Sequence, residues 1–453
     1  MIKLENTITE FLNTQYKEFS QYTVAERAIP SLCDGLKPGA RKIVNAMFTG
    51  SLKDGKTYKL LSLVGDTMKL SLYAHGDASL VGTICTISKD FFNFYNPLEI
   101  EGQGGILRAP EAGSPRYLYI RKSKWADLVY GMDYNLLNFK TEEGQVVEPY
   151  NYLPIIPTIL SNLSMGIANG YSFHTMSYNP LDIINYCISI LENKKKKIEI
   201  KPFLRGIKES NWKYINNSWY SYGEWKFYKT KDTMIITDLP YDMTYNNFEK
   251  ILNTLCEKNI IKNYIDTSEN GNIQYNISFP KNTLNTELKK DPEGLSLVNK
   301  FKLIKQVPDD LLWVLNEKGN LTHFEDKYEL IKYFVNYRLK IYKERKKILV
   351  KILNEKISKN DDFIKFIELV CKGKLKIRNR SKKDIKTDMD KYKLSMNFIS
   401  TPMSKCTIEE QNELMKENQK IKDELNYIMN TSEEQMYIND LNDLKKIIKK
   451  EIT

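Results

Sequence analysis

The first third of the chain has apolar residues at helical spacing, divided by turn-forming residues. Apolar positions three or four residues apart fall on one face of a helix, and residues 1–29 carry this spacing at Ile8, Phe11, Leu12, Tyr16 and Phe19. Pro30 ends this helix, because a proline inside a helix clashes with the preceding turn. Three further short helices are predicted at residues 40–48, 60–72 and 78–88, the last with Asp77 as its N-cap. Short helices separated by tight turns are typical of winged-helix units, which place one helix in a DNA groove.

The pattern changes in the rest of the chain. An amphipathic helix is predicted at residues 180–200. Polar and apolar residues then alternate as in strands, at residues 203–207, 212–229, 234–240 and 272–279, with a helix at residues 248–258. From residue 325 to the end the spacing is helical and heptad-like, which predicts two long arms separated by a loop-rich stretch at residues 372–402. These patterns predict a multidomain α/β (α+β) protein.

The composition favours a polyanionic partner. The chain has 453 residues and a net charge of +11 at pH 7, so binding to phosphates would release counterions, although a lysine-rich surface alone would give the same charge. Its six cysteines form no CxxC pair, which predicts neither a zinc site nor a disulfide framework and favours a reducing compartment. The sequence has no apolar signal core and no run of 18 apolar residues, so neither a secreted nor a membrane-spanning protein is expected.

Residues 102–121, GQGGILRAPEAGSPRYLYIR, join a glycine-rich half to a half in which polar and apolar residues alternate. We predict a loop followed by a short strand at residues 115–120, with Tyr117 and Tyr119 on one face and Arg116 and Leu118 on the other. A phenolate attacks phosphorus once a nearby cation lowers its pKa, and a guanidinium stabilises charge on phosphoryl oxygens. Tyr117 and Arg116 are therefore candidates for phosphoryl transfer, although packing is the commoner role of any one of 29 tyrosines.

Three other motifs surround this stretch. They are RAIPSLCDGLKPGAR at residues 27–41, HGD at residues 75–77 and PIIPTILSNLSMGIANG at residues 154–170. In this order and spacing, together with GSPRY, they resemble the DNA-cleaving (breakage–reunion) subunit of type IIA DNA topoisomerases, a family that includes the gyrase A and topoisomerase IV subunits. The compact length is most similar to the medium subunit of the type II topoisomerases of large tailed bacteriophages.

The resemblance implies a winged-helix DNA-binding and cleavage domain at residues 1–155, an α+β tower domain at residues 156–325 and a coiled-coil dimerisation or exit-gate domain at residues 326–453. It also implies that Tyr117 is the catalytic nucleophile, with Tyr119 as its nearest rival. Tyr117 would attack a DNA phosphate, displace the 3′-oxygen and hold the break as a 5′-phosphotyrosyl bond. Resealing then needs no hydrolysis, because the bond energy is conserved.

The same resemblance implies roles for seven other residues. Arg27 matches an arginine near the scissile phosphate, and His75 matches the histidine of the cleavage site. Ile167 matches an isoleucine that wedges between base pairs and bends DNA, although a core isoleucine beside a glycine turn would fit the residues alone. Arg116 is the charge-stabilising neighbour of the nucleophile, and the positions that match DNA-backbone contacts are Lys37, Arg41 and Lys42. The family often has a second histidine at the position of Tyr73 or Ala74, and that contribution is missing here.

The cofactors are expected on another polypeptide. The sequence has no GxxxxGK[ST] nucleotide loop and no acidic cluster after a strand. The family uses Mg²⁺ in a Toprim domain and ATP in an ATPase domain, so the resemblance implies a separate large subunit that holds both. It implies further a homodimer through the C-terminal coiled coil, double-stranded DNA as substrate, no membrane, and a phage-encoded protein of the host bacterial cytoplasm.

Two other functions remain open from the residues. A non-catalytic DNA-binding or architectural protein could keep the same fold, and it would differ only in whether Tyr117 becomes linked to DNA. A tyrosine recombinase or nickase would normally need more Arg and His around one tyrosine than a chain with three histidines offers, and it would leave the helical arms unexplained.

Overall fold

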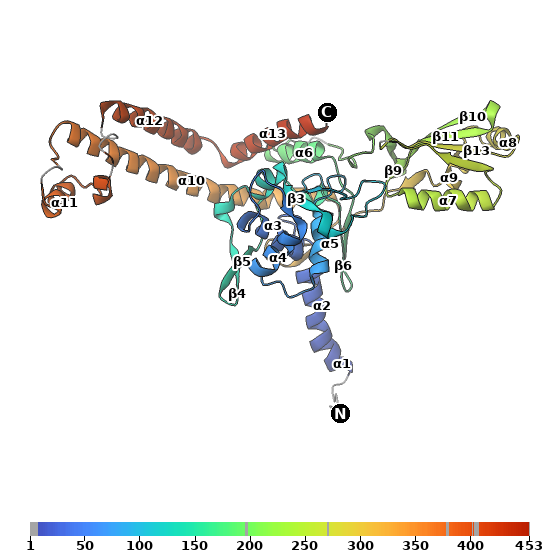
Figure 1. Cartoon of the computed structure of the whole chain (residues 1–453), viewed down its shortest axis with the longest axis horizontal. Helices are drawn as coiled ribbons and strands as arrows, with labels where there is room; N and C mark the ends of the chain where they lie inside the picture. Colours follow the sequence, from blue (N-terminus) through green and yellow to red (C-terminus); the bar gives the residue numbers. More distant parts are fainter. Residues whose placement is uncertain are drawn as a thin grey trace. The chain divides into compact units, whose positions relative to one another are not determined.

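The structure is a computed structural model that describes residues 8–194, 198–269, 271–376, 380–400, 402 and 407–452 (Figure 1). The chain divides into two compact units, one made of Met1–Val335 with Leu444–Thr453 and the other of Asn336–Asp443. Helices and antiparallel sheets are both present, which confirms the predicted α/β (α+β) class. The division into three domains stays a prediction. Within the described ranges, no helix is long and apolar enough to cross a membrane.

The N-terminal helices agree closely with the pattern of apolar residues. A continuous helical segment runs through α1 Ile8–Phe11, η1 Leu12–Tyr16, α2 Lys17–Thr23 and η2 Val24–Ala28, where η1 and η2 are π-helical. Three helices follow as predicted: α3 Pro38–Thr49, α4 Leu60–Leu70 and α5 Asp77–Ile87. The predicted cap of α5 is wrong by one residue, because Gly76 is the N-cap. Asp77 begins the helix, and its carboxylate accepts a hydrogen bond from the next backbone N–H and favours the positive end of the helix dipole.

A three-stranded sheet carries the end of the glycine-rich stretch. Its order is β1-β3-β2, from β1 Tyr58–Lys59, β3 Tyr119–Lys122 and β2 Leu98–Glu101. The prediction of a strand from residue 115 is wrong, because Pro115–Tyr117 forms a 3₁₀ turn (η3) and the strand begins at Tyr119. Proline suits the first position of such a turn, since its φ is already fixed there.

A second sheet joins distant parts of the sequence in the order β16-β15-β7-β6. Its strands are β6 Ser164–Ile167, β7 Ser172–Thr175, β15 Leu311–Leu315 and β16 Leu321–Phe324. β15 pairs with β7 through Leu311 with His174 and Leu312 with Phe173. Strands β4 Phe139–Glu142 and β5 Gln145–Pro149 form a hairpin that precedes β6 in the sequence. Three short helical turns lie between the strands of this part of the chain: η4 Ala126–Tyr130, η5 Tyr134–Leu136 and η6 Thr158–Leu160. Helix α6 Pro180–Leu191 confirms the amphipathic helix predicted from residue 180, but it ends at Leu191 and does not reach residue 200. The Asn179 side chain caps it.

Residues 212–306, called here the α+β block, contain two antiparallel sheets in the orders β10-β11-β13-β12 and β14-β9-β8. The strands are β8 Trp212–Ile215, β9 Ser218–Tyr222, β10 Glu224–Tyr228, β11 Thr233–Asp238, β12 Asn263–Asp266, β13 Tyr275–Ser278 and β14 Ile304–Gln306. The helices and short turns of the block are η8 Lys229–Lys231, α7 Tyr245–Glu257, α8 Thr283–Lys290 and α9 Leu295–Lys300, and the 3₁₀ turn η7 Glu209–Asn211 directly precedes it. The predicted strand at residues 203–207 is wrong, since no strand lies there.

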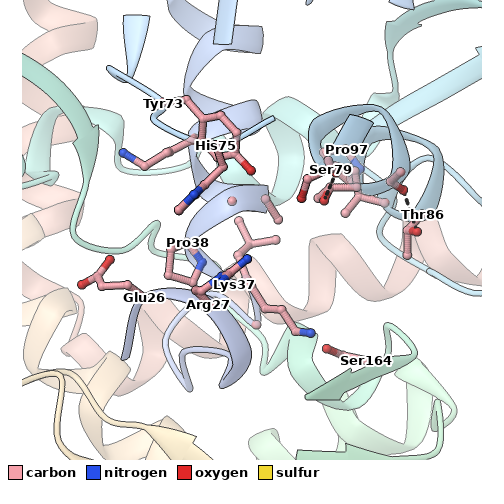
Figure 2. Close-up of a pocket in the computed structure, with 18 of the residues that line it drawn as sticks. Glu26, Arg27, Lys37, Pro38, Tyr73, His75, Ser79, Thr86, Pro97 and Ser164 are labelled. Carbon is pink, nitrogen blue, oxygen red and sulfur yellow. Dashed lines mark hydrogen bonds between the residues drawn. The ribbon is translucent and has the colours of Figure 1, made fainter. Parts of the chain in front are cut away.

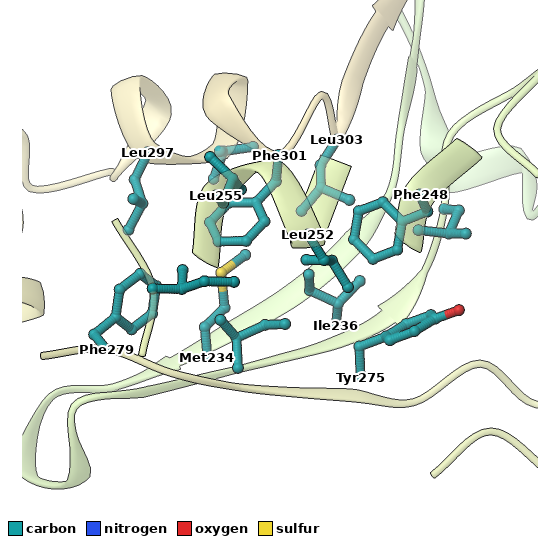
Figure 3. Packing of buried hydrophobic residues seen from close by; sticks show 14 of the residues in the cluster. Met234, Ile236, Phe248, Leu252, Leu255, Tyr275, Phe279, Leu297, Phe301 and Leu303 are labelled. Atoms are coloured by element: carbon teal, nitrogen blue, oxygen red, sulfur yellow. The ribbon is translucent and has the colours of Figure 1, made fainter. Parts of the chain in front are cut away.

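The α+β block has its own apolar core (Figure 3). Side chains from α7, such as Phe248 and Leu252, pack on strand residues such as Ile236 and Tyr275, and all four are fully buried. Phe301 closes the other side of the core from the end of α9. Helix α7 and the sheet β10-β11-β13-β12 are therefore held together by apolar packing.

The unit Asn336–Asp443 is helical. The long helix α10 Lys327–Cys371 enters it, and α12 Ile408–Asn430 and α13 Glu433–Ile452 return along it. Asn418 donates to the Asp361 carboxylate (2.6 Å), and the Tyr342 and Tyr437 rings stack with centroids 4.6 Å apart. The two long arms that the spacing predicted are therefore present and antiparallel, and their role in dimerisation stays a prediction.

The stretch between the arms was predicted as loop and is partly helical. It contains α11 Lys382–Lys391 and the 3₁₀ turn η9 Met396–Ser400. Buried Phe366 and Ile367 of α10 pack with Ile385 and Met389 of α11 in a small core. The apolar residues of this short helix are too few to show its period in the sequence.

Candidate functional site

Four of the predicted site residues line one cavity of about 600 Å³ in the N-terminal helical region (Figure 2). Arg27 reaches it from η2, Lys37 and Lys42 from the start of α3, and His75 from the turn before α5. Figure 2 shows the side chains of Arg27, Lys37 and His75 around the same hollow. Three basic side chains and an imidazole outnumber the two carboxylates of the lining, Glu26 and Glu142, so the cavity favours an anionic group such as a phosphate.

Arg27 is exposed and lies in a π-helical turn directly before the chain leaves the helix at Ile29. π-Helical turns inside helices are uncommon and are found frequently at functional sites. A guanidinium held here on a helix end offers two parallel N–H donors to a phosphate.

His75 lies between two tyrosines. The Tyr22 hydroxyl is 2.9 Å from His75 Nε2, and the Tyr73 ring meets the imidazole edge-on with centroids 5.4 Å apart. The sequence pattern did not reveal Tyr22 as a site residue, because helical spacing assigns it only to one face of a helix. The hydroxyl can donate to Nε2 or accept from it, depending on which ring nitrogen carries the proton.

Lys37 is half-buried and is the N-cap residue of α3. Its ammonium donates to the Met165 carbonyl of β6 (2.7 Å), and burial lowers its pKa below the usual lysine value. A phosphate in the cavity would favour the charged form of this side chain. Lys37 therefore fits the predicted backbone contact.

Arg41 is buried and paired inside the protein. Its side chain is 5% exposed and forms a two-point ion pair with Asp34, through Nε at 2.8 Å and Nη2 at 3.0 Å, and donates also to the Leu36 carbonyl. Burial alone would lower the pKa of Arg41, but the Asp34 charge and hydrogen bond raise it. The contact of Arg41 with the DNA backbone stays a prediction, and it would have to replace this internal pair.

Lys42 is intermediate between Lys37, which lies at the cavity, and Arg41, which is paired inside the protein. Its ammonium bonds the carboxylate of Glu148 (3.0 Å), which is buried, and the Ser71 carbonyl (3.0 Å). A phosphate contact by Lys42 would have to replace one of these bonds. The role of Glu148 as its partner was not foreseen, because the two residues are 106 positions apart.

Tyr117 lies outside this cavity. It ends the turn η3, and its side chain is 71% exposed, while Leu118 is buried and Tyr119 is 40% exposed. Arg116 is exposed as well, so the expectation that Arg116 shares a face with Leu118 is wrong. The exposed hydroxyl of Tyr117 beside an exposed guanidinium can reach a phosphate that approaches from outside.

Tyr117 and His75 are at opposite ends of α4. At the start of α4, the backbone N–H of Leu60 donates to the carbonyl of Leu118, the residue after Tyr117 (3.1 Å). His75 lies beyond the other end of α4, in the turn that follows its last residue, Leu70. An 11-residue helix is about 16 Å long. One chain therefore does not bring the candidate nucleophile into the cavity with His75 and Arg27.

Ile167 is at the tip of the β6–β7 hairpin and is 72% exposed. Met165 on the same strand is also exposed. Gly166 between them lies against the helix end, where a Cβ would come within 2.1 Å of the Ala28 carbonyl. The hairpin is thus fixed beside Arg27 with two apolar side chains pointing out of the protein, as a DNA wedge requires.

The described ranges contain no group of three His, Cys, Asp or Glu side chains that could hold a metal ion.

Comparison with known proteins identifies relatives of this chain. Residues 27–444 match the family of the DNA gyrase/topoisomerase IV A-subunits. The mitochondrial DNA topoisomerase 2 of Dictyostelium discoideum is 31% identical over 394 residues, which cover 85% of this chain and 30% of that protein. DNA topoisomerase 2-beta of Mus musculus is 30% identical over 392 residues, covering 84% and 24%. The chain thus spans between about a quarter and a third of the length of these curated relatives.

A solved structure is also similar. The crystal structure of the Plasmodium falciparum topoisomerase II DNA-binding, cleavage and re-ligation domain superposes with a TM-score of 0.85 at 26% identity, covering 97% of this chain and 64% of that one.

Proposed function

Because the chain belongs to the family of the DNA gyrase/topoisomerase IV A-subunits, we propose that it cleaves and rejoins DNA as part of a type II topoisomerase, with Tyr117 as nucleophile. The observation that carries this assignment is the exposed Tyr117 hydroxyl beside Arg116, at the end of a fixed loop. The phenol oxygen forms a bond to phosphorus as the bond to the deoxyribose 3′-oxygen breaks. The phenolic proton leaves and the 3′-oxygen takes one up, so the exchange is reversible without a cofactor.

The cationic cavity receives the scissile phosphate in this proposal. Arg27 and Lys37 balance the charge that builds on the phosphoryl oxygens, and His75 donates to one of them or handles the proton in transfer. Arg116 adds a guanidinium from the Tyr117 side.

A second copy of the chain completes each site. Tyr117 is about 16 Å along α4 from the cavity of its own chain, so one phosphate cannot touch both. Two copies arranged around a two-fold axis can place Tyr117 of one copy over the cavity of the other. The helical unit Asn336–Asp443 is our candidate for the dimer contact.

The β6–β7 hairpin bends the DNA beside this site. Exposed Ile167 enters a base step, and the cost of unstacking is repaid by the larger protein surface that bent DNA covers.

We further propose a separate large subunit that holds ATP and Mg²⁺. When bound, Mg²⁺ would stabilise charge on the phosphate and the leaving oxygen. The sequence has no P-loop motif, and the arrangement would match the medium subunit of a tailed-bacteriophage enzyme that acts in the cytoplasm of its bacterial host.

Covalent trapping tests the function. The protein is mixed with duplex DNA and Mg²⁺, with and without the candidate large subunit, and denatured with SDS. Protein linked to DNA 5′ ends, dependent on the partner and lost in Tyr117→Phe, is the expected result. If no linkage forms with any competent partner, the chain is a DNA-binding scaffold.

A further inference from the structure

The loop that leads to Tyr117 is closed on itself. Residues 102–114, called here the glycine loop, are joined at the base by Gly113 N–H donating to the Gln103 carbonyl (2.8 Å). Near the tip, Ile106 and Ala109 exchange two backbone hydrogen bonds of 3.0 Å, which leave the two residues between them at the turn. Gly105 permits this closure, because its φ is +93° and a Cβ there would lie 2.7 Å from the Pro110 carbonyl.

One of the two residues at this tip is Arg108, which is only 5% exposed. Its guanidinium donates to four acceptors, and all of them belong to the end of β11 or to the turn between β11 and α7. They are the Asp238 carboxylate (2.9 Å) and the backbone carbonyls of Leu239, Pro240 (2.7 Å) and Met243 (3.3 Å). The tip of the glycine loop is therefore inserted into the base of the α+β block.

The backbone of Arg108 and the carboxylate of Asp238 are also held in place by hydrogen bonds. The Tyr245 N–H, at the start of α7, donates to the Arg108 carbonyl (2.9 Å). Asp238 also accepts from Asn211 Nδ2 (3.1 Å) and from the Leu239 N–H (2.8 Å), so its carboxylate cannot turn away from the arginine. Burial lowers the pKa of Arg108, which marks the pair as desolvated.

Other contacts do not replace this anchor. Within the described chain, the glycine loop also receives the Lys89 ammonium at the Pro110 carbonyl (2.6 Å), but that lysine comes from the segment after α5. Arg108 is the member of the loop that puts a charged side chain inside the α+β block. From this anchor to Tyr117 the chain is nine residues long and is shortened by the closure at Gly113.

We propose that Arg108 is a positioning residue for DNA cleavage, which fixes the glycine loop on the α+β block and so sets the place of the Tyr117 hydroxyl. This rests on the function proposed above. Arg108 touches neither DNA nor the reacting atoms; it acts through the loop. Misplacing a nucleophile by about 1 Å can cost roughly 100-fold in rate, so the cleavage step is sensitive to this anchor while DNA affinity is not.

The test removes both charges together. Arg108→Met with Asp238→Asn leaves no lone charge buried, which protects the fold better than removal of one partner. DNA affinity is measured by fluorescence anisotropy and covalent complex by SDS trapping at saturating DNA, both with the complete enzyme. We expect a loss of covalent complex of roughly 10- to 100-fold, with a change in the dissociation constant of no more than about threefold.

Two further variants sharpen the result. Arg108→Lys keeps the charge but lacks the fork of donors, so its cleavage should fall between the wild type and the double variant. Lys305→Ala breaks an exposed ion pair of the same block, with Asp242 at 2.6 Å, and should leave cleavage unchanged.

The outcomes separate this inference from the proposed function. If the wild type forms no covalent complex, the proposed function fails and the positioning role fails with it. If the wild type is active and the double variant cleaves equally well, Arg108 does not position Tyr117. If DNA affinity, thermal stability and cleavage of the double variant fall together, Arg108 is a structural residue and the proposal is wrong.

Discussion

Replacing Arg41 with alanine distinguishes a core residue from a DNA contact. The sequence places Arg41 among DNA-contacting residues, whereas the structure buries its guanidinium against Asp34. Asp34 is fully buried, and once the arginine is removed its remaining donors among the described residues are the backbone N–H groups of Leu36 and Tyr152 (both 3.0 Å). Removal of one partner from a buried ion pair typically costs about 3–5 kcal/mol.

This cost is large against the stability of a typical domain, which is about 5–15 kcal/mol. Urea unfolding followed by circular dichroism should therefore show a clearly lower midpoint for Arg41→Ala than for the wild type. Arg27→Ala is the matched control, because Arg27 is exposed in the same region and its loss should change stability by less than about 0.5 kcal/mol. Arg27→Ala should instead lose DNA cleavage.

Arg41 is not a core residue if Arg41→Ala unfolds at the wild-type urea concentration and binds DNA more weakly at a temperature where both proteins are folded. Arg41 would then contact DNA as the sequence suggested, and the Asp34 pair would contribute little.

Three other predictions follow from the site. Copies carrying Tyr117→Phe mixed with copies carrying His75→Ala should nick DNA, because a site shared between chains leaves one intact site in each mixed dimer; sites within single chains would leave none. DNA affinity should fall as the pH rises from neutral to 10.5, since burial lowers the pKa of Lys37 and the neutral amine does not attract phosphate; Lys37→Arg should flatten this profile. Gly166→Ala should lower the free energy of unfolding by about 1–3 kcal/mol in urea, because its Cβ would lie 2.1 Å from a carbonyl oxygen of η2. Gly65→Ala is the control and should be neutral or stabilising, because Gly65 lies within α4 and a Cβ there would meet no atom within 4 Å.

The elements with a strong local pattern could be predicted from the sequence. The helices at the N-terminus and the long arms follow apolar spacing, and the turn in the first hairpin of the α+β block has Asn216 and Asn217, both with positive φ. Pairings between distant segments could not be predicted. β7 pairs with β15 more than 130 residues later, and local spacing carries no information about such a partner.

The candidate site residues were predicted from their residue types, and the structure adds which of their side chains are buried. Lysine and arginine near a DNA-binding helix look equivalent in a sequence, yet Lys37 opens to the cavity and Arg41 faces inward. Asp34, seven residues before Arg41, was the available signal for an internal pair. Arg108 was missed, because its acceptors are mostly backbone carbonyls about 130 residues away.

The most direct test of the account is to identify the residue that carries the DNA. The trapped complex is digested with nuclease and protease, and the nucleotide-bearing peptide is sequenced by mass spectrometry. We predict a 5′-phosphonucleotide on Tyr117, within the peptide that contains Arg116. A nucleotide on Tyr119 or on any other residue would contradict the assignment of the nucleophile, and the proposed role of the glycine loop would fall with it.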